Sequence, residues 1–408
     1  MRSARRPTIA VIGAGVGACS LLASLRRGGW PGPLLAVESG RAPGGRTATR
    51  RSRDDHGLRL DHGAPLFNIV HEPPPALVEP LLELGAIGPF SGGTATLASD
   101  GTITPGSEDP LLSGRLYRGL GGMDRLCRGL VQLAEQAGER LGAPAPALRF
   151  GVLARQLVPL AGGGWQLLDH LDQPLLSADW LVLASTLPAH PRTRLLLDWP
   201  EAPLRAAARS LADPQLDHAL ASIASIRSQP RSNLLLVPSA AQAEAWRRLP
   251  FRLLSFDALA QQRWGLSRLS IQDLDDGRMA VVAHSTAVFA AEFLSVYGTG
   301  SAIARVLGTP PRLEEEQAVI AALLDNLSQA MAGLLPAQAM DNASPRLMRW
   351  GAALPERPGL PPDLSLCPQS RVAFCGDYLE LPGFGRVEGA LRSGESLAAR
   401  LLRLLEPC

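Results

Sequence analysis

The chain begins with a short apolar run that leads into a glycine-rich turn. Residues 8–12 (TIAVI) are apolar or β-branched, as is typical of a parallel strand buried on both faces. Residues 18–27 form the predicted helix, which ends at Gly28 and Gly29, and residues 33–37 form a second apolar run. The pattern predicts a strand, a helix and a second strand, which is the size and order of a βαβ unit.

Further apolar runs follow along the chain. Apolar stretches occur at residues 151–157, 165–168 and 179–184, the last of which reads as a strand before a turn, and residues 372–374 read as a strand followed by a helix over 386–405. Between them, residues 191–345 contain short apolar stretches and one long amphipathic helix over 314–331. One side of that helix is apolar and is expected to pack on a sheet; it carries Val319, Ile320, Leu323, Leu324, Leu327 and Met331.

Composition points to a globular protein with little net charge. The 408 residues are 46% hydrophobic and 19% charged, which suits two or three packed domains and excludes a disordered chain. A formal charge of +2 gives no electrostatic case for nucleic acid or an anionic membrane as the main partner. All 40 basic residues are arginine. The absence of lysine excludes Schiff-base and lysine general-base chemistry.

Cysteine and histidine usage favours a reducing compartment without a metal site. The five cysteines form no CxxC pair and are odd in number, which argues against a disulfide framework or a zinc site and favours the cytoplasm. His56 and His62 are close in sequence, but their spacing is poor metal geometry. The apolar N-terminal run is broken by glycines and lacks a signal-peptide cleavage site, and no run is long enough to span a membrane. We therefore expect no stable membrane insertion.

The glycine-rich turn has the spacing of a dinucleotide-binding motif. In Gly13-x-Gly15-x-x-Ala18, the first glycine permits the tight turn, the second lets a pyrophosphate approach the backbone, and the alanine keeps strand and helix close. Glu38 follows the second strand and would accept hydrogen bonds from ribose hydroxyls. Arg41 could pair with a 2′-phosphate, but Glu38 would repel it, so NADP is disfavoured while NAD and FAD both stay open.

Later segments of the chain distinguish FAD from NAD. Residues 44–47 (GGRT) resemble the GGR segment of the FAD-dependent amine oxidase and phytoene desaturase superfamily, and residues 60–67 (LDHGAPLF) resemble the D-x-G-A segment of its renalase-like branch. Residues 376–377 (GD) and 386–390 (RVEGA) are similar to the family's C-terminal FAD motif. The resemblance implies that Asp377 holds a ribityl hydroxyl, that the following helix faces the flavin, and that Val152 meets the adenine through its backbone.

The resemblance implies an α/β fold: a Rossmann-type FAD-binding domain of the glutathione-reductase-like class with an inserted, mixed α+β substrate domain. It places residues 1–72, 145–190 and 346–408 in the FAD-binding domain, and residues 73–144 and 191–345 in the substrate domain and connecting elements. An antiparallel sheet with helices on one side would suit that substrate domain. The residues expected to bind FAD are Gly13, Ala14, Gly15, Gly17, Ala18, Glu38, Ser39, Arg41, Gly45, Arg46, His62, Gly63, Ala64, Val152, Gly376, Asp377, Arg386, Val387 and Ala390.

The expected activity follows from the resemblance: an FAD-dependent oxidoreductase, with non-covalent FAD, that takes a hydride from a small amine-like or dihydropyridine-like substrate and passes the electrons to oxygen. Many amine oxidases of the superfamily position a water near the flavin with a lysine, and this chain has none. A polyene desaturase or isomerase, a non-enzymatic flavin-binding carrier and an NAD-dependent dehydrogenase stay open as alternatives. Candidate substrate-side residues are His62, Phe67, His284, Trp350 and Tyr378; among them His62, His284 and Tyr378 are the candidates for catalysis, and none is assigned as a catalytic base.

Overall fold

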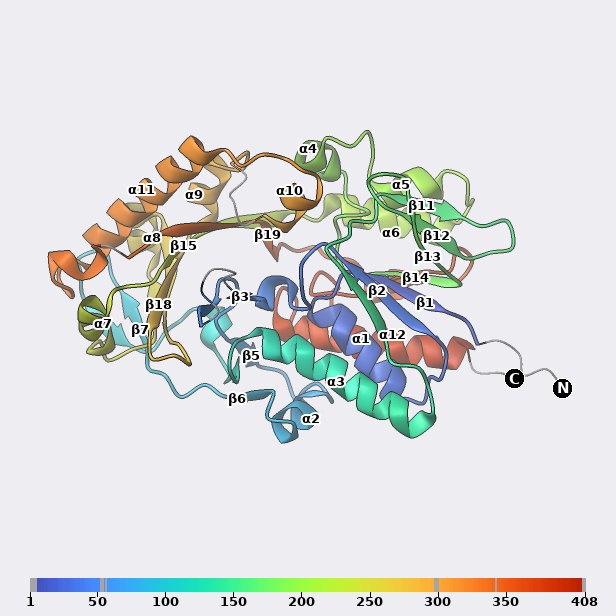
Figure 1. The fold of residues 1–408 in the computed structure, drawn as a ribbon, viewed down its shortest axis with the longest axis horizontal. Helices are drawn as coiled ribbons and strands as arrows, with labels where there is room; N and C mark the ends of the chain where they lie inside the picture. Colours follow the sequence, from blue (N-terminus) through green and yellow to red (C-terminus); the bar gives the residue numbers. More distant parts are fainter. Residues whose placement is uncertain (1–5, 52–54, 56, 297–300, 342, 406–408) are drawn as a thin grey trace.

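The molecule consists of two halves, each built around one large sheet (Figure 1). The computed structural model describes residues 6–51, 55, 57–296, 301–341 and 343–405. One half contains a six-stranded sheet and the other a seven-stranded sheet. The chain passes between the halves several times, so each half is assembled from segments that are far apart in sequence.

The six-stranded sheet is mainly parallel and fully buried at its centre. Its strand order is β10-β2-β1-β14-β21-β20, and all neighbours are parallel except β20 and β21. Strand β1 is buried along its whole length, which explains its apolar sequence. The strands are β1 (Ile9–Ile12), β2 (Leu34–Glu38), β10 (Ala147–Phe150), β14 (Trp180–Leu183), β20 (Leu366–Cys367) and β21 (Val372–Phe374).

Both faces of this sheet are covered. Three helices cover one face and share a core with it: α1 (Val16–Arg27), α3 (Asp124–Leu141) and α12 (Val387–Leu405). Beside them lie α2 (Val78–Glu83) and the small sheet of β5 (Phe67–Ile69), β6 (Ile87–Pro89) and β9 (Arg115–Gly119). The other face is covered by elements from two neighbouring segments: β11 (Gln156–Pro159), β12 (Trp165–Leu168), β13 (Pro174–Ala178), α5 (Pro203–Ala208) and α6 (Pro214–Ser225).

The seven-stranded sheet has an apolar face and a more polar one. Its order is β19-β15-β18-β17-β16-β7-β8, and its neighbours are antiparallel except β16 and β7. One face packs on α11 (Leu313–Met331) in a large apolar core. The strands are β7 (Thr94–Leu97), β8 (Ile103–Pro105), β15 (Ser228–Leu236), β16 (Leu253–Phe256), β17 (Leu266–Asp273), β18 (Met279–Ser285) and β19 (Arg346–Pro355).

The remaining elements are short. The ribbon of β3 (Thr49–Arg51) and β4 (Arg59–Asp61) follows the turn η1 (Gly45–Thr47). Within the described residues, no helix has the length and apolar character that crossing a membrane requires. The other helices are α4 (Thr193–Leu197), α7 (Ala240–Arg247), α8 (Ala258–Trp264), α9 (Ala287–Glu292) and α10 (Ala302–Val306).

The mixed α/β class and the Rossmann-like unit agree with the sequence expectation, but several segments pack differently from the expected division. Helix α3 lies within residues 73–144, yet its apolar side packs on α1 through Leu126 and Leu130 rather than on the seven-stranded sheet. Helices α5 and α6 also belong to the half with the six-stranded sheet, because they share a core with it. Strand β19 belongs to the seven-stranded sheet, where it pairs with β15. Each of these elements lies where its apolar face can be buried, whichever part of the sequence it comes from.

Candidate functional site

The turn between β1 and α1 is built to receive a ligand against its backbone. Gly13 has φ of +108°, a conformation that favours glycine. Gly15 is the N-cap of α1 and supplies no side-chain cap, so the first N–H groups of the helix are left for a ligand. A Cβ on Gly17 would lie 3.1 Å from Gly376 Cα. The start of α1 therefore packs directly against the loop that follows β21, which brings the first and last predicted motifs together.

Glu38, at the end of β2, is held by the same turn. Its Oε2 accepts a hydrogen bond from Ala14 N at 2.9 Å, and its Oε1 accepts one from Gly40 N at 2.6 Å. The Ser39 hydroxyl donates to Oε1 at 3.2 Å. The carbonyl oxygen of Glu38 accepts from Val152 N at 3.1 Å. These contacts fix the carboxylate beside the glycine-rich turn, in the position where an acidic residue of a dinucleotide fold accepts ribose hydroxyls.

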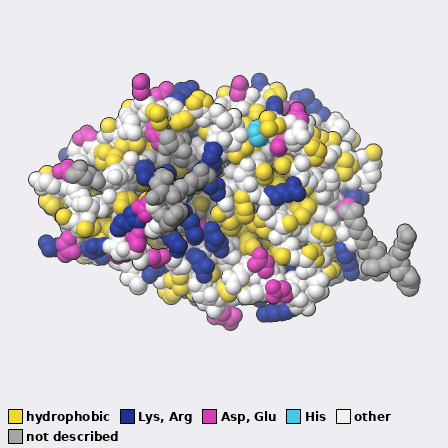
Figure 2. Space-filling view, in the orientation of Figure 1, with side chains coloured by type: hydrophobic (Ala, Val, Ile, Leu, Met, Phe, Trp, Pro, Cys, Tyr) yellow, Lys and Arg dark blue, Asp and Glu magenta, His cyan; other side chains and the backbone are white. Residues whose placement is uncertain are grey.

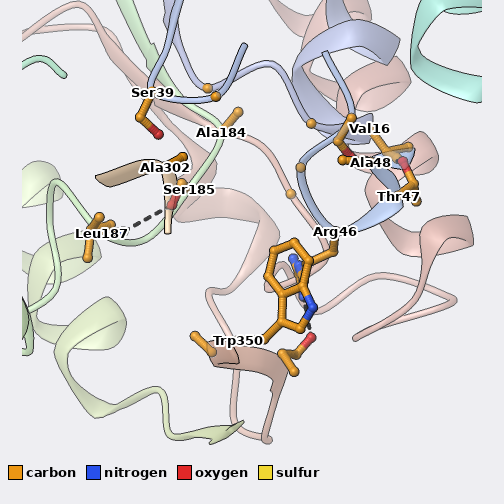
Figure 3. A pocket seen from close by; sticks show the side chains of 18 of the residues that line it. Val16, Ser39, Arg46, Thr47, Ala48, Ala184, Ser185, Leu187, Ala302 and Trp350 are labelled. Atoms are coloured by element: carbon orange, nitrogen blue, oxygen red, sulfur yellow. Dashed lines mark hydrogen bonds between the residues drawn. The ribbon is translucent and has the colours of Figure 1, made fainter. Parts of the chain in front are cut away.

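Arg46 and Asp377 connect the second motif to the C-terminal one. Arg46 Nη1 donates to Asp377 Oδ2 at 2.7 Å, and Nη2 donates to Asp377 Oδ1 at 2.5 Å. Nη1 also donates to the carbonyl oxygen of Ala353 at 2.7 Å. Such a bidentate ion pair fixes the orientation of both side chains. Figure 3 shows Arg46 and Trp350 among the residues that line the cavity.

These motifs surround one cavity of about 1110 Å³. It runs past the ends of β1 and β2, η1, the loop after β14 and the start of α12; Figure 3 shows Val16, Ser39, Ala184 and Arg46 around it. Of the residues expected to bind FAD, those lining it are Gly13, Gly15, Gly17, Glu38, Ser39, Arg41, Gly45, Arg46, His62, Ala64, Val152, Gly376, Asp377, Arg386, Val387 and Ala390.

Three residues of the expected set do not line this cavity. Ala14 acts through its backbone, which donates to Glu38. Ala18 is fully buried in the core beneath the turn. Gly63 lines a second, adjoining cavity, and a Cβ there would overlap the carbonyl oxygen of Arg46. Glycine is therefore required at position 63 because of this close backbone approach.

The first cavity is lined by more cationic than anionic side chains. Figure 2 shows basic side chains gathered on this face between the half with α11 and the half with α1 and α3. Two of the three lining carboxylates, Asp124 and Asp377, are in ion pairs with arginines. This excess suits an anionic ligand. The lining arginines are Arg41, Arg46, Arg50, Arg51, Arg128, Arg192, Arg268, Arg305, Arg346, Arg349 and Arg386.

His62 lies in the wall near the junction of the two halves. Its ring stacks on Trp350 with centroids 5.5 Å apart and an angle of 15° between the planes. Its carbonyl oxygen accepts from Asn233 Nδ2 at 2.8 Å and from Trp350 Nε1 at 3.3 Å. Burial, with a contribution from the Arg50 charge, lowers the pKa of His62 to about 4. The imidazole is therefore neutral at pH 7.

The other candidate side chains differ in what they can reach. The Tyr378 hydroxyl donates to the Leu183 carbonyl at 2.9 Å, and burial raises its pKa well above the usual value. Its hydroxyl is thus engaged in packing the loop after β21 against β14. Phe67 stacks on Tyr117 with ring centroids 5.5 Å apart while lining the first cavity. His284 lines the second cavity instead.

The second cavity, of about 980 Å³, adjoins the first. The residues that line both cavities are Arg46, Ala64, Leu111, Arg268, Trp350, Ala353 and Leu354. Its polar lining residues include Asp109, Arg231, Asn233 and Arg268, which were not among the sequence candidates. The available signal was a polar residue at the edge of an apolar run, as at Asn233, which directly precedes the run LLLV at residues 234–237.

No metal centre is evident in the part of the chain that the structure describes. There, no three or more histidine, cysteine or acidic residues gather in a way that could hold a metal ion. His56, considered with His62 from the sequence, lies outside the described residues. Cys19, Cys127, Cys367 and Cys375 are free and buried.

Comparison with known proteins identifies the fold. The family model of the NAD(P)-binding Rossmann-like domain matches residues 11–78. No protein of curated function matches the sequence. Among solved structures, a putrescine oxidase bound to putrescine aligns with a TM-score of 0.61 at 14% identity, over 97% of this chain and 99% of that one.

Two further structures show the same fold over nearly the whole chain. Cyclohexylamine oxidase from Brevibacterium oxydans IH-35A aligns with a TM-score of 0.61 at 15% identity, over 98% of this chain and 100% of that one. An oxidoreductase from Methanosarcina mazei aligns with a TM-score of 0.59 at 13% identity, over 96% of this chain and 100% of that one. The chain therefore has the α/β fold shared by these oxidases, with a Rossmann-like unit at its N-terminus.

Proposed function

We propose that this chain is an FAD-dependent oxidoreductase that takes a hydride from a small amine-like or dihydropyridine-like substrate, with oxygen as electron acceptor. One observation carries the proposal: motifs at residues 13–17, 38–41, 45–46, 376–377 and 386–390 converge on one cavity, which adjoins a second cavity suited to a substrate. The fold shared with putrescine oxidase and cyclohexylamine oxidase supports it.

The residues around the first cavity fit FAD. The uncapped start of α1, where Gly15 leaves room beside the Gly45 backbone, would receive the pyrophosphate. Glu38 and the backbone at Val152 would hold the adenosine part. Asp377, fixed by Arg46, would meet the ribityl chain, and the start of α12 would face the flavin. The excess of arginines offsets the charge of the pyrophosphate.

Cys375 supports non-covalent binding. This thiol is fully buried, and the cavity lining does not include it. Burial raises its pKa to about 12, so the sulfur stays a neutral thiol at pH 7 rather than a nucleophilic thiolate. We therefore propose that FAD is held by the contacts described above and not by a bond to this cysteine.

The protein's contribution to the chemistry is orientation and exclusion of water. Bound FAD would supply a two-electron hydride acceptor. Trp350 lines both cavities, and His62, which stacks on it, lines the first; this pair would orient the substrate there. A neutral His62 and the absence of lysine leave no positioned ammonium beside this pair. A substrate with an already activated hydride suits such a site, which supports a renalase-like activity.

Substrate reduction of the flavin tests the proposal. The flavin-loaded protein is mixed anaerobically with amines, isomeric dihydronicotinamides and short polyenes while the flavin absorbance is followed. Bleaching by an amine or a dihydronicotinamide, followed by recovery of colour and formation of hydrogen peroxide on adding oxygen, is the expected result. Bleaching by polyenes alone would indicate a desaturase. If no compound of any class reduces the flavin, a carrier is the better explanation, and a colourless protein that binds NADH would indicate a dehydrogenase.

A further inference from the structure

The face of the seven-stranded sheet that lines the second cavity presents a row of polar residues. Asn233 of β15 is paired in register with His284 of β18, and His284 with Arg268 of β17. Paired residues of neighbouring strands point to the same face, as do residues two apart on one strand. Arg231, two residues before Asn233, is paired with Trp350 of β19. The row therefore ends beside the wall shared by the two cavities, and all five residues line the second cavity.

The guanidinium of Arg231 uses only part of its hydrogen-bond donors within the protein. Its Nη1 donates to the Pro230 carbonyl at 2.8 Å, and its Nη2 donates to Gln229 Oε1 at 2.9 Å. Within the described chain, no carboxylate forms an ion pair with this guanidinium. A guanidinium carries five N–H donors, so several are left. Burial and the nearby charge of Arg268 lower the pKa of Arg231 to about 10, so the side chain is still a cation at pH 7.

Other atoms of the row lack partners as well. Buried atoms with no hydrogen-bond partner among the described residues are Arg268 Nε, His284 Nε2 and Asn233 Oδ1. Arg268 pairs with Asp109 through Nη2 only. Buried polar groups of this kind are normally satisfied, and leaving several of them unpaired on one cavity wall is costly. A bound ligand with acceptor oxygens and an N–H group would satisfy them together.

We infer that the second cavity binds the carboxylate of the substrate: Arg231, assisted by Arg268 and His284, holds a carboxylate group, so that the substrate is a small amine or dihydropyridine bearing a carboxylate. This inference rests on the proposed function for its amine or dihydropyridine part. Asn233 Oδ1 would accept the N–H of the same molecule. The carboxylate would thereby anchor the substrate at the end of the cavity that adjoins Trp350.

The local charge favours a monoanion over other ligands. Arg231 and Arg268 with Asp109 leave one positive charge, and His284 adds none because burial and the two arginines lower its pKa to about 3. A diamine would be repelled, and Asp109 disfavours a phosphate dianion. The rest of the lining adds Arg46, which is paired with Asp377, and two more carboxylates: Glu108 is exposed, and Asp257 caps α8 by accepting from Ala260 N at 2.7 Å.

Calorimetric titration with matched probes tests this inference. The probes are benzoate and cyclohexanecarboxylate, the neutral benzamide, the cationic benzylamine, and phenyl phosphate, each added to the purified full chain at pH 7.5. At least one carboxylate is expected to bind roughly tenfold or more tightly than benzamide, because a charge-assisted hydrogen bond to arginine is lost in the amide. Arg231→Met is expected to remove that preference, and Arg231→Lys to restore part of it.

The control is Arg248→Met, which changes an exposed arginine at the C-terminal end of α7, paired with Glu244, and is expected to leave every affinity unchanged. Equal binding of benzoate and benzamide, tighter binding of phenyl phosphate or benzylamine, no binding of either carboxylate, or an unaltered preference in Arg231→Met would each overturn the inference. The probe comparison in the unaltered chain needs no variant to fold. The flavin spectrum of the same sample reports on the proposed function separately, since the calorimetric readout requires no turnover.

Discussion

Arg46 and Asp377 are 331 residues apart in sequence and form a two-pronged ion pair in the wall of the first cavity, with N–O distances of 2.7 and 2.5 Å. Asp377 is almost fully buried, whereas the Arg46 side chain is 40% exposed. The pair joins the turn after β2 to the loop after β21. It therefore joins two segments that are far apart in sequence at the part of the proposed cofactor site that would meet the ribityl chain.

Removing Arg46 is expected to destabilise the protein more than neutralising its partner. Arg46→Met leaves a buried carboxylate unpaired and should lower the free energy of unfolding by about 1–3 kcal/mol. In Asp377→Asn no buried charge is left without its partner. Urea unfolding of both single variants and the double variant should give a coupling energy of about 1–2 kcal/mol. The exposed pair Arg115 and Glu72 is the control, with a coupling below about 1 kcal/mol; similar values for the two pairs would contradict this interpretation.

Glu38 is expected to matter for FAD affinity. Glu38→Ala removes a charged acceptor, a loss of about 1.5–3 kcal/mol, so the dissociation constant of FAD should rise roughly ten- to a hundredfold. Part of the effect will come from the turn itself, because the carboxylate also holds Ala14 N and Gly40 N. Glu38→Gln keeps one acceptor oxygen and should lie between the two. The measurement is fluorescence titration of the apoprotein with FAD.

Gly15→Val tests the close approach at the start of α1. The valine side chain would project into the cavity, since Gly15 lines it and its Cβ would meet only Gly45 Cα at 4.0 Å. FAD occupancy after dialysis should fall more than in Glu38→Ala while the fold persists. Gly162→Val is the matched control, because a Cβ there meets nothing within 4 Å. Full occupancy in both Gly15→Val and Glu38→Ala would mean that the motif is structural only.

His62 should make the protein less stable in acid. Its folded pKa of about 4 lies below the ordinary value of 6.5, so the unfolded chain binds the extra proton and stability falls as pH drops from 6.5 to 4. The full effect is about 3 kcal/mol. Asp61 opposes this trend, since burial raises its pKa to about 6. The comparison of His62→Gln with the unaltered chain isolates the histidine: denaturant unfolding should show a smaller loss in the variant between pH 6.5 and 4.

Simple primary amines should reduce the flavin slowly, and isomeric dihydronicotinamides faster. No lysine is present to orient a water at the flavin, and His62 is neutral and buried. His62→Ala should therefore cause only a modest loss of rate unless it also disturbs the flavin. Anaerobic stopped-flow absorbance checks both points. Fast reduction by a simple amine, or a loss beyond about a thousandfold in His62→Ala, would identify a true general base and contradict the mechanism.

The residues of the proposed cofactor site could be predicted from sequence because their signals are local. The turn at Gly13 and Gly15, and Glu38 after the next strand, follow each other within one βαβ unit, and the structure places them as the spacing indicated. The substrate side could not be predicted in the same way. Arg231 and Arg268 come together only through the register of β15, β18 and β17, which depends on long-range pairing. Tyr378 lines the first cavity beside Asp377, but the sequence could not show that its hydroxyl donates to the Leu183 carbonyl, because that contact depends on how the loop after β21 packs on β14.

The most direct test is the cofactor itself. The purified protein should be yellow, and denaturation with acid should release intact FAD into the supernatant while the precipitated protein stays colourless. That result follows from the convergence of the glycine-rich turn, Glu38 and Asp377 on one cavity. Flavin that stays with the precipitate would contradict non-covalent binding. A colourless protein that cannot be reconstituted with FAD would contradict the proposed function as a whole.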